Sequence, residues 1–207
     1  MAPGIVDSAR AVRPGEELDE ARLEAFLRER LGLLGPLRVE QFPSGYSNLT
    51  YLLRMGDKEL VLRRPPIGAR IATAHDMGRE YRILDRLAPV YPRAPRPLLY
   101  EDGALLGAPF YVMERVTGLI LRRDVPPGLT LGADEMARLS TALLDVLVEL
   151  HEVDAAAAGL GELGRPEGYV ERQVTGWTQR YRNARTDDHP SLERVAAWLG
   201  EHDYRSE

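Results

Sequence analysis

The spacing of the apolar residues changes once along this chain, and that change constrains the fold more than any other feature of the sequence. Three short segments between residues 37 and 64 alternate apolar and polar side chains, and residues 98–101 and 109–116 add two more. From Ala133 onward, apolar residues recur instead every three or four positions. Alternation indicates strands and the longer spacing indicates helices, so the sequence predicts a sheet followed by a helical region.

The first three strands are expected at Leu37–Gln41, Leu49–Met55 and Lys58–Arg64, separated by turn-forming residues. Such a run predicts an antiparallel meander. A helix over residues 18–31 should precede it, and a second over 76–88 should follow it, because each has apolar residues along one face. The fold class is therefore α+β.

The helical region should contain a long helix that starts at Ala133 and two shorter ones over 166–182 and 192–199. Trp177 and Tyr181, four residues apart, are expected in its core. We expect a flexible lead-in over residues 1–15, a first lobe over 16–116 and a partial helical lobe over 117–207.

Composition excludes several classes of function. The net charge of the 207 residues is −5, which disfavours nucleic acid as a partner. The chain has no cysteine, so disulfides, thiolate metal sites and a cysteine nucleophile are excluded, and a reducing cytoplasm is the expected location. The four histidines are dispersed and indicate no metal site. No apolar segment is long enough to cross a membrane, so no membrane partner is expected.

Five stretches carry a resemblance to a known family. They occur in the family's order, as SGYSNLTYLL (44–53), VLRRPP (61–66), REYRIL (79–84), PFYVME (109–114) and GYVERQ (168–173). With them the chain resembles the aminoglycoside phosphotransferase and choline kinase-like family, especially the kinase-like domains related to those fused to acyl-CoA dehydrogenases. The resemblance implies a protein-kinase-like fold with two lobes, an antiparallel sheet with one main helix in the ATP-binding lobe, and ATP-dependent transfer of phosphate to a hydroxyl of a small molecule.

The loop between the first two strands is a candidate phosphate-binding loop. Ser44, Gly45, Ser47 and Asn48 are small or carry side-chain donors, so backbone N–H groups there can approach phosphate oxygens. An ordinary hairpin turn is the alternative interpretation, because such loops are common.

Three residues match the family's phosphate-positioning pair and adenine cover. Val61 and Arg63 share one face of their strand, since alternate residues do. The resemblance places Val61 over the adenine and Arg63, instead of the usual lysine, toward the phosphates. Glu80 should pair with Arg63, since a carboxylate near a core needs a partner. The alternatives are a surface Arg63 and a Glu80 that pairs with its helix neighbours Arg79 or Arg82.

The segment after the last strand resembles the family's adenine-binding hinge. The resemblance implies that Met113 lines the back of the pocket and that the backbone of Glu114 and Val116 faces the adenine. The alternative is a buried strand that runs into a turn.

The family's catalytic loop, His-x-Asp-x-x-x-x-Asn, does not occur in the chain. We therefore expect a nucleotide-binding N-terminal portion with no catalytic or metal-binding residues of its own, although the complete family fold uses Mg²⁺. A non-catalytic pseudokinase, a partner-binding module or a decayed scaffold is the alternative. Apolar faces of the partial helical lobe should be exposed, which predicts dimerisation or a stabilising partner.

Overall fold

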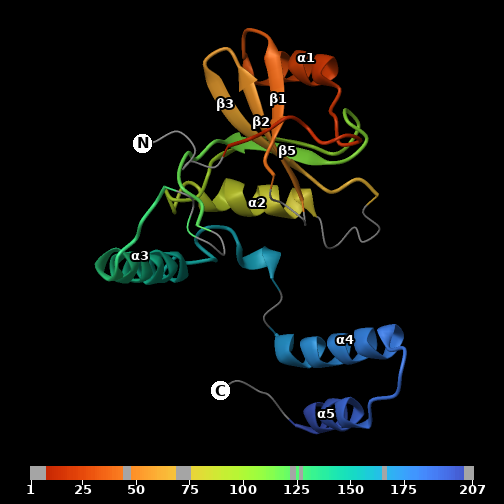
Figure 1. The fold of residues 1–207 in the computed structure, drawn as a ribbon. Coiled ribbons are helices and arrows are strands. Elements are labelled where there is room, and N and C mark those ends of the chain that lie inside the picture. Colours follow the sequence, from red (N-terminus) through yellow and green to blue (C-terminus); the bar gives the residue numbers. More distant parts are fainter. Residues whose placement is uncertain are drawn as a thin grey trace. The chain divides into compact units, whose positions relative to one another are not determined.

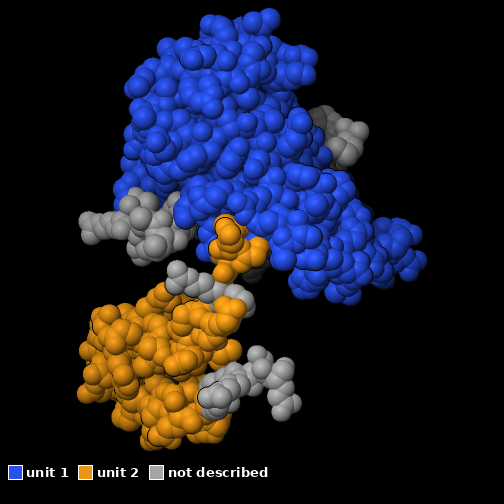
Figure 2. Space-filling model, turned by 180° about the vertical axis from the view of Figure 1, so that it is seen from behind, with its two compact units in different colours: residues 1–160 blue, residues 161–207 orange. Residues whose placement is uncertain are grey.

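The computed structural model describes residues 8–43, 48–68, 76–121, 125, 128–164 and 167–202. The chain forms two compact units, residues 1–160 and 161–207, which Figure 2 shows in blue and orange. Each unit is described by itself. The expected boundary between two lobes after Val116 stays a prediction.

Unit 1 contains a five-stranded sheet in the order β1-β2-β3-β5-β4, and every neighbouring pair is antiparallel. The meander expected from the sequence is confirmed residue for residue. The strands are β1 (Leu37–Gln41), β2 (Leu49–Met55), β3 (Lys58–Arg64), β4 (Pro97–Glu101) and β5 (Phe110–Glu114).

The α-helices begin and end close to the expected positions. They are α1 (Glu20–Leu31), α2 (Met77–Leu87), α3 (Ala133–His151), α4 (Tyr169–Ala184) and α5 (Pro190–Glu201), and a short 3₁₀ helix spans Gly161–Leu163. An aspartate caps each of the first two helices. Asp19 accepts a hydrogen bond of 3.0 Å from the amide of Arg22, and Asp76 one of 2.8 Å from the amide of Arg79. The Asp19 cap explains why α1 begins two residues later than predicted.

The hydrophobic core lies on the face of the sheet that packs against α1 (Figure 1). Apolar residues of α1 meet alternate residues of the strands, and the fully buried members include Leu23, Leu27, Tyr51, Leu62, Phe110 and Val112. The intervening strand residues point to the opposite face, because side chains alternate along a strand. That opposite face carries α2, whose Tyr81 packs against Tyr100 and Tyr111. The candidate site lies on this second face.

The segment before α1 is hydrogen-bonded to the end of β1. Arg10 and Gln41 exchange two backbone hydrogen bonds of 2.8 Å. The amide of Arg13 donates to the side-chain carbonyl of Gln41 at 2.9 Å. Residues 8–15 were expected to belong to a flexible lead-in, and these bonds hold them to the sheet instead.

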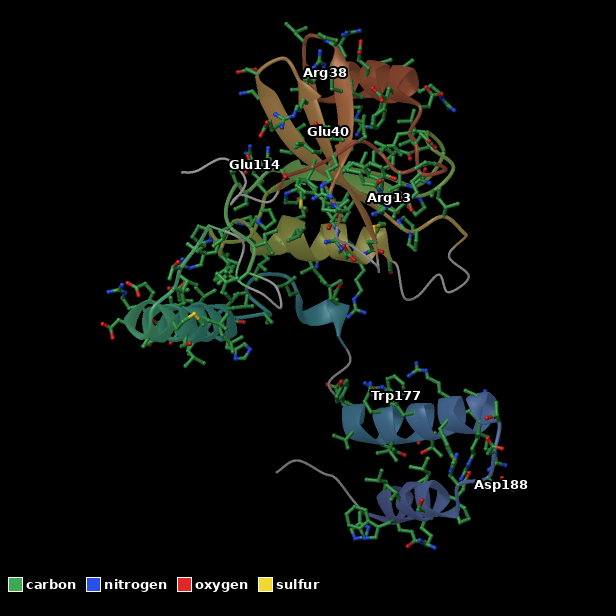
Figure 3. All side chains as sticks on the ribbon, viewed as in Figure 1. Arg13, Arg38, Glu40, Glu114, Trp177 and Asp188 are labelled. Carbon is green, nitrogen blue, oxygen red and sulfur yellow. The ribbon has the colours of Figure 1, made fainter. Side chains whose placement is uncertain are left out.

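The three later helices expose their apolar faces. No described residue of α3, α4 or α5 is buried. Leu143 of α3 is 69% exposed, and Trp177 of α4, expected in the core, is 63% exposed (Figure 3). That expectation was wrong because, within unit 2, α4 packs against the single helix α5, which leaves most of the Trp177 side chain exposed. None of the helices in the described ranges has the length and apolarity needed to span a bilayer.

Candidate functional site

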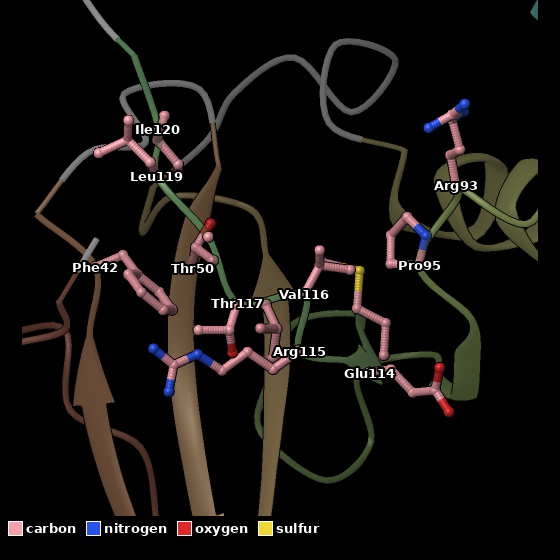
Figure 4. Close-up of a pocket in the computed structure, with 13 residues that line it drawn as sticks. Phe42, Thr50, Arg93, Pro95, Glu114, Arg115, Val116, Thr117, Leu119 and Ile120 are labelled. Atoms are coloured by element: carbon pink, nitrogen blue, oxygen red, sulfur yellow. The ribbon is translucent and has the colours of Figure 1, made fainter. Parts of the chain in front are cut away.

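A pocket of about 510 Å³ lies on the face of the sheet opposite α1 (Figure 4). Strand residues form one side, and the segment that follows β5 forms the other. Its lining consists of Phe42, Thr50, Val61, Arg93, Pro95, Met113, Glu114, Arg115, Val116, Thr117, Gly118, Leu119 and Ile120. The volume lies within the usual range for small-molecule sites.

Two of the expected residues form the apolar wall of this pocket. Val61 and Met113 are direct cross-strand partners on β3 and β5, so their side chains lie side by side on one face. Thr50 of β2 lines the same face one strand away. The pocket therefore offers a flat apolar surface next to main-chain polar groups.

Glu114 lines the pocket, and its side chain forms an ion pair with Arg96. Its amide donates to the carbonyl of Arg96 at 2.9 Å, and its carboxylate pairs with the Arg96 guanidinium at 2.7 Å. Figure 4 shows this carboxylate directed away from the labelled residues opposite. The carboxylate of Glu114 is thus engaged by Arg96, and the role expected for the backbone of Glu114 stays a prediction.

Arg115 is a largely buried charge in the pocket wall that the sequence did not reveal. Its side chain is only 12% exposed and pairs with Glu59 of β3. Glu59 also pairs with Arg54 of β2, which in turn bonds Glu40 of β1 at 2.9 Å. This chain of alternating charges holds the segment after β5 against three strands.

Glu80 pairs with Arg63, as the sequence predicted. The Nη2 atom of Arg63 lies 3.3 Å from Oε2 of Glu80, which joins β3 to α2. Arg79 and Arg82 were the alternative partners. Among the described residues, neither arginine forms an ion pair with Glu80. Both members of the pair are about one-third exposed, so water reaches it and weakens its contribution to stability.

Two further side chains bind the same carboxylate. The side-chain amide of Asn48 donates to Oε1 of Glu80 at 2.8 Å, and the hydroxyl of Tyr111 donates to Oε2 at 3.0 Å. Asn48 was expected to offer its side chain to phosphate, and the structure directs its Nδ2 to Glu80. The other expected loop residues, Ser44, Gly45 and Ser47, lie outside the described residues.

Burial dominates the electrostatics around the pair. It raises the pKa of the Tyr111 hydroxyl well above its ordinary value; the Arg63 charge opposes that rise and Glu80 adds to it. Tyr111 therefore stays protonated and acts as a donor. The Nε atom of Arg63 is buried and has no hydrogen-bond partner among the described residues.

These features suit a ligand with a flat apolar group and an anionic group. The pocket lined by Val61 and Phe42 can take the ring, and Arg63 can approach the anion with its guanidinium, whose Nε atom has no hydrogen-bond partner in the described part of the chain. Among the described residues, no group of three or more histidine, cysteine, aspartate or glutamate side chains could hold a metal ion.

Two residues of the site that the sequence analysis missed, Thr50 in the pocket wall and Tyr111 beside Glu80, follow from alternation along the strands. Thr50 shares a face with Asn48, and Tyr111 shares one with Met113, so both could have been assigned from the sequence. Arg93 and Ile120 could not, because each lies in an irregular segment without a period to follow.

Comparisons with known proteins show the family to which this chain belongs. Residues 38–206 match the family described as "Phosphotransferase enzyme family". Over 200 residues the chain is 38% identical to acyl-CoA dehydrogenase family member 10 of Mus musculus, a match that covers 95% of this chain and 18% of the mouse protein. It is 35% identical over 194 residues to acyl-CoA dehydrogenase family member 11 of Rattus norvegicus, a match that covers 91% of this chain and 25% of the rat protein.

A solved structure from Ralstonia eutropha, provisionally assigned as an aminoglycoside phosphotransferase, has the same fold. It superimposes with a TM-score of 0.71 at 33% identity, over 91% of this chain and 55% of that one. The chain thus spans about half of this solved structure and a quarter or less of the two curated relatives.

Proposed function

Because this chain belongs to the phosphotransferase enzyme family and has its protein-kinase-like α+β fold, we propose that it provides the nucleotide-binding part of an ATP-dependent small-molecule kinase. One observation carries the proposal. The apolar slot beside Val61 and Met113 lies on the same face of the sheet as the Arg63–Glu80 pair. A nucleotide needs both features, an apolar surface for its base and a fixed cation for its phosphates.

The base is proposed to enter between the strands and the segment after β5. Val61 and Met113 supply the apolar wall, and the backbone of Glu114 and Val116 supplies polar groups at the edge of the ring. The engagement of the Glu114 side chain by Arg96 supports this assignment, because it leaves the main chain to face the ligand.

Arg63 is proposed to hold the phosphates. Its guanidinium is anchored by Glu80, and a planar guanidinium binds phosphate oxygens through two donors at once. The Nε atom, which has no hydrogen-bond partner among the residues that the structure describes, supports this role, because a buried donor without a partner is costly and a phosphate oxygen would satisfy it. Ser44, Gly45, Ser47 and the backbone of Asn48 are proposed to contact the same phosphates, while the Asn48 side chain binds Glu80.

Phosphoryl transfer itself is proposed to require groups that this chain does not supply. The described residues do not fit a protein-held Mg²⁺, so no step is assigned to one. The His-x-Asp-x-x-x-x-Asn sequence, which would orient an acceptor hydroxyl, is absent from the 207 residues. The acceptor is a small molecule with a hydroxyl group, and the cytoplasm is the proposed location.

The exposed apolar side chains of α3 favour a second candidate, a non-catalytic module that binds a nucleotide or a protein partner. The two candidates differ in turnover. Binding of ATP without its consumption when small-molecule alcohols are supplied would favour the second.

Isothermal titration with Mg-ATP and with adenosine tests the proposal. The unaltered chain should bind both, and Val61→Phe should abolish both by filling the slot. Val90→Phe is the matched control, since Val90 is exposed and lies outside the pocket. Failure of the unaltered chain to bind either compound would refute the proposed function.

A further inference from the structure

Glu80 receives more hydrogen bonds than an ion pair with Arg63 requires. Asn48 donates to Oε1 at 2.8 Å and Tyr111 donates to Oε2 at 3.0 Å, whereas Arg63 Nη2 approaches Oε2 at 3.3 Å. Two neutral donors therefore lie closer to the carboxylate than the cation does. Charge-assisted hydrogen bonds are ordinarily the shorter ones, so the order of distances is unusual.

Tyr111 is fixed where it can bind this carboxylate. It is the direct cross-strand partner of Arg63 on β3 and β5, and it is almost completely buried. Its ring packs against Tyr81 of α2, with the centroids 6.5 Å apart. The hydroxyl is thus held beside Glu80 by the sheet and by the helix that carries Glu80.

This arrangement matters because residue 63 is an arginine and not a lysine. A guanidinium can bind a carboxylate with two parallel hydrogen bonds, and that geometry would direct two of its donors to Glu80. With Oε1 bonded to Asn48 and Oε2 to Tyr111, the carboxylate offers Arg63 a single long contact. The Nε atom of Arg63 remains without a partner among the described residues.

We propose that Tyr111, together with Asn48, is a positioning residue that acts through Glu80. Each neutral donor takes one acceptor position on a carboxylate oxygen, which disfavours a two-point ion pair and leaves the guanidinium of Arg63 able to bind the nucleotide phosphates. The inference rests on the proposed function, because it assigns Arg63 to the phosphates. It adds two roles, those of Tyr111 and of the Asn48 side chain.

The test compares phosphate-dependent and base-dependent binding. Tyr111→Phe removes the hydroxyl and keeps the ring that packs against Tyr81. It should weaken Mg-ATP binding about 10-fold, the effect of one charged hydrogen bond, and leave adenosine binding unchanged. Tyr100→Phe is the matched control: Tyr100 also packs against Tyr81, but its hydroxyl makes no hydrogen bond to Glu80 among the described residues. It should change neither affinity.

A double-mutant cycle separates positioning from a general structural effect. A lysine at position 63 cannot form the two-point pair, so Tyr111→Phe should weaken Mg-ATP binding much less in an Arg63→Lys background. Equal losses in both backgrounds would overturn the inference, as would a parallel loss of adenosine binding. If Tyr111→Phe binds Mg-ATP as tightly as the unaltered chain does, the inference is overturned and the proposed function still stands. If the unaltered chain binds neither compound, the proposed function and the inference fail together.

Discussion

The hydroxyl of Tyr51 donates a 2.7 Å hydrogen bond to the backbone carbonyl of Glu16 and so joins the centre of β2 to the segment before α1. The carboxylate of Glu16 in turn accepts from the side chains of Gln41 and Arg13. These contacts tie the start of the chain to the face of the sheet that packs against α1. The opposite face, with the pocket, is thereby left accessible to a ligand.

Stability should fall at high pH because of Tyr51. Burial raises the pKa of its hydroxyl to about 12, compared with about 10 in an unfolded chain. Below pH 10 both states are protonated and the contribution is constant. Between pH 10 and 12 the unfolded chain ionises first, so the contribution of Tyr51 to the free energy of unfolding should fall by up to about 3 kcal/mol, and Tyr111, whose pKa burial also raises, should add to the total fall. Denaturant titrations over this pH range measure the fall.

Tyr51→Phe identifies the source of that fall. The variant should lose about 1 kcal/mol at neutral pH with its hydrogen bond, and its further loss between pH 10 and 12 should be smaller than that of the unaltered chain. Tyr169→Phe, at an exposed position, should behave like the unaltered chain. An unchanged alkaline loss in Tyr51→Phe would show that other groups cause it.

Gly56 should resist substitution more than other glycines with positive φ. It lies in the turn between β2 and β3 at φ +60°, and an added Cβ would lie 2.7 Å from the backbone carbonyl oxygen of Leu34. Gly32, which ends α1 at φ +66°, has open space instead. Gly32→Ala should cost about 1 kcal/mol of stability, and Gly56→Ala distinctly more. Thermal unfolding compares them; equal losses would mean that the turn yields to the methyl group.

The sequence predicted the strands and helices that have a clear apolar period, and it missed an ion pair between residues far apart in the chain. All five strands were predicted because alternation and turn residues are local signals. The Arg63–Glu80 pair was predicted because the family resemblance adds a long-range constraint. The Glu59–Arg115 pair spans 56 positions and has no local signature. Trp177 was misplaced because a helical stripe shows which face is apolar but does not show what covers it.

Glu59→Gln should destabilise the wall of the pocket. The substitution keeps the side-chain volume and removes the charge that Arg115 and Arg54 share. Because Arg115 is nearly buried, its guanidinium cannot recover water freely, and we expect a loss of about 1–2 kcal/mol together with weaker adenosine binding. Glu40→Gln is the control, since Glu40 pairs with Arg54 near the surface and should cost at most about 1 kcal/mol. Similar effects of the two variants on adenosine binding would argue against a special role for Arg115.

Self-association should depend on the apolar face of α3. Leu143 and Leu144 are 69% and 61% exposed, and Val148 lies one turn beyond Leu144 on the same face. Exposed apolar surface of this kind favours association, so the molar mass measured by light scattering should rise with protein concentration. Leu143→Glu combined with Leu144→Glu should reduce that rise. Leu34→Glu, which also replaces an exposed leucine but lies before β1, should not. A monomeric mass for the unaltered chain at every concentration would show that α3 is not a self-association surface.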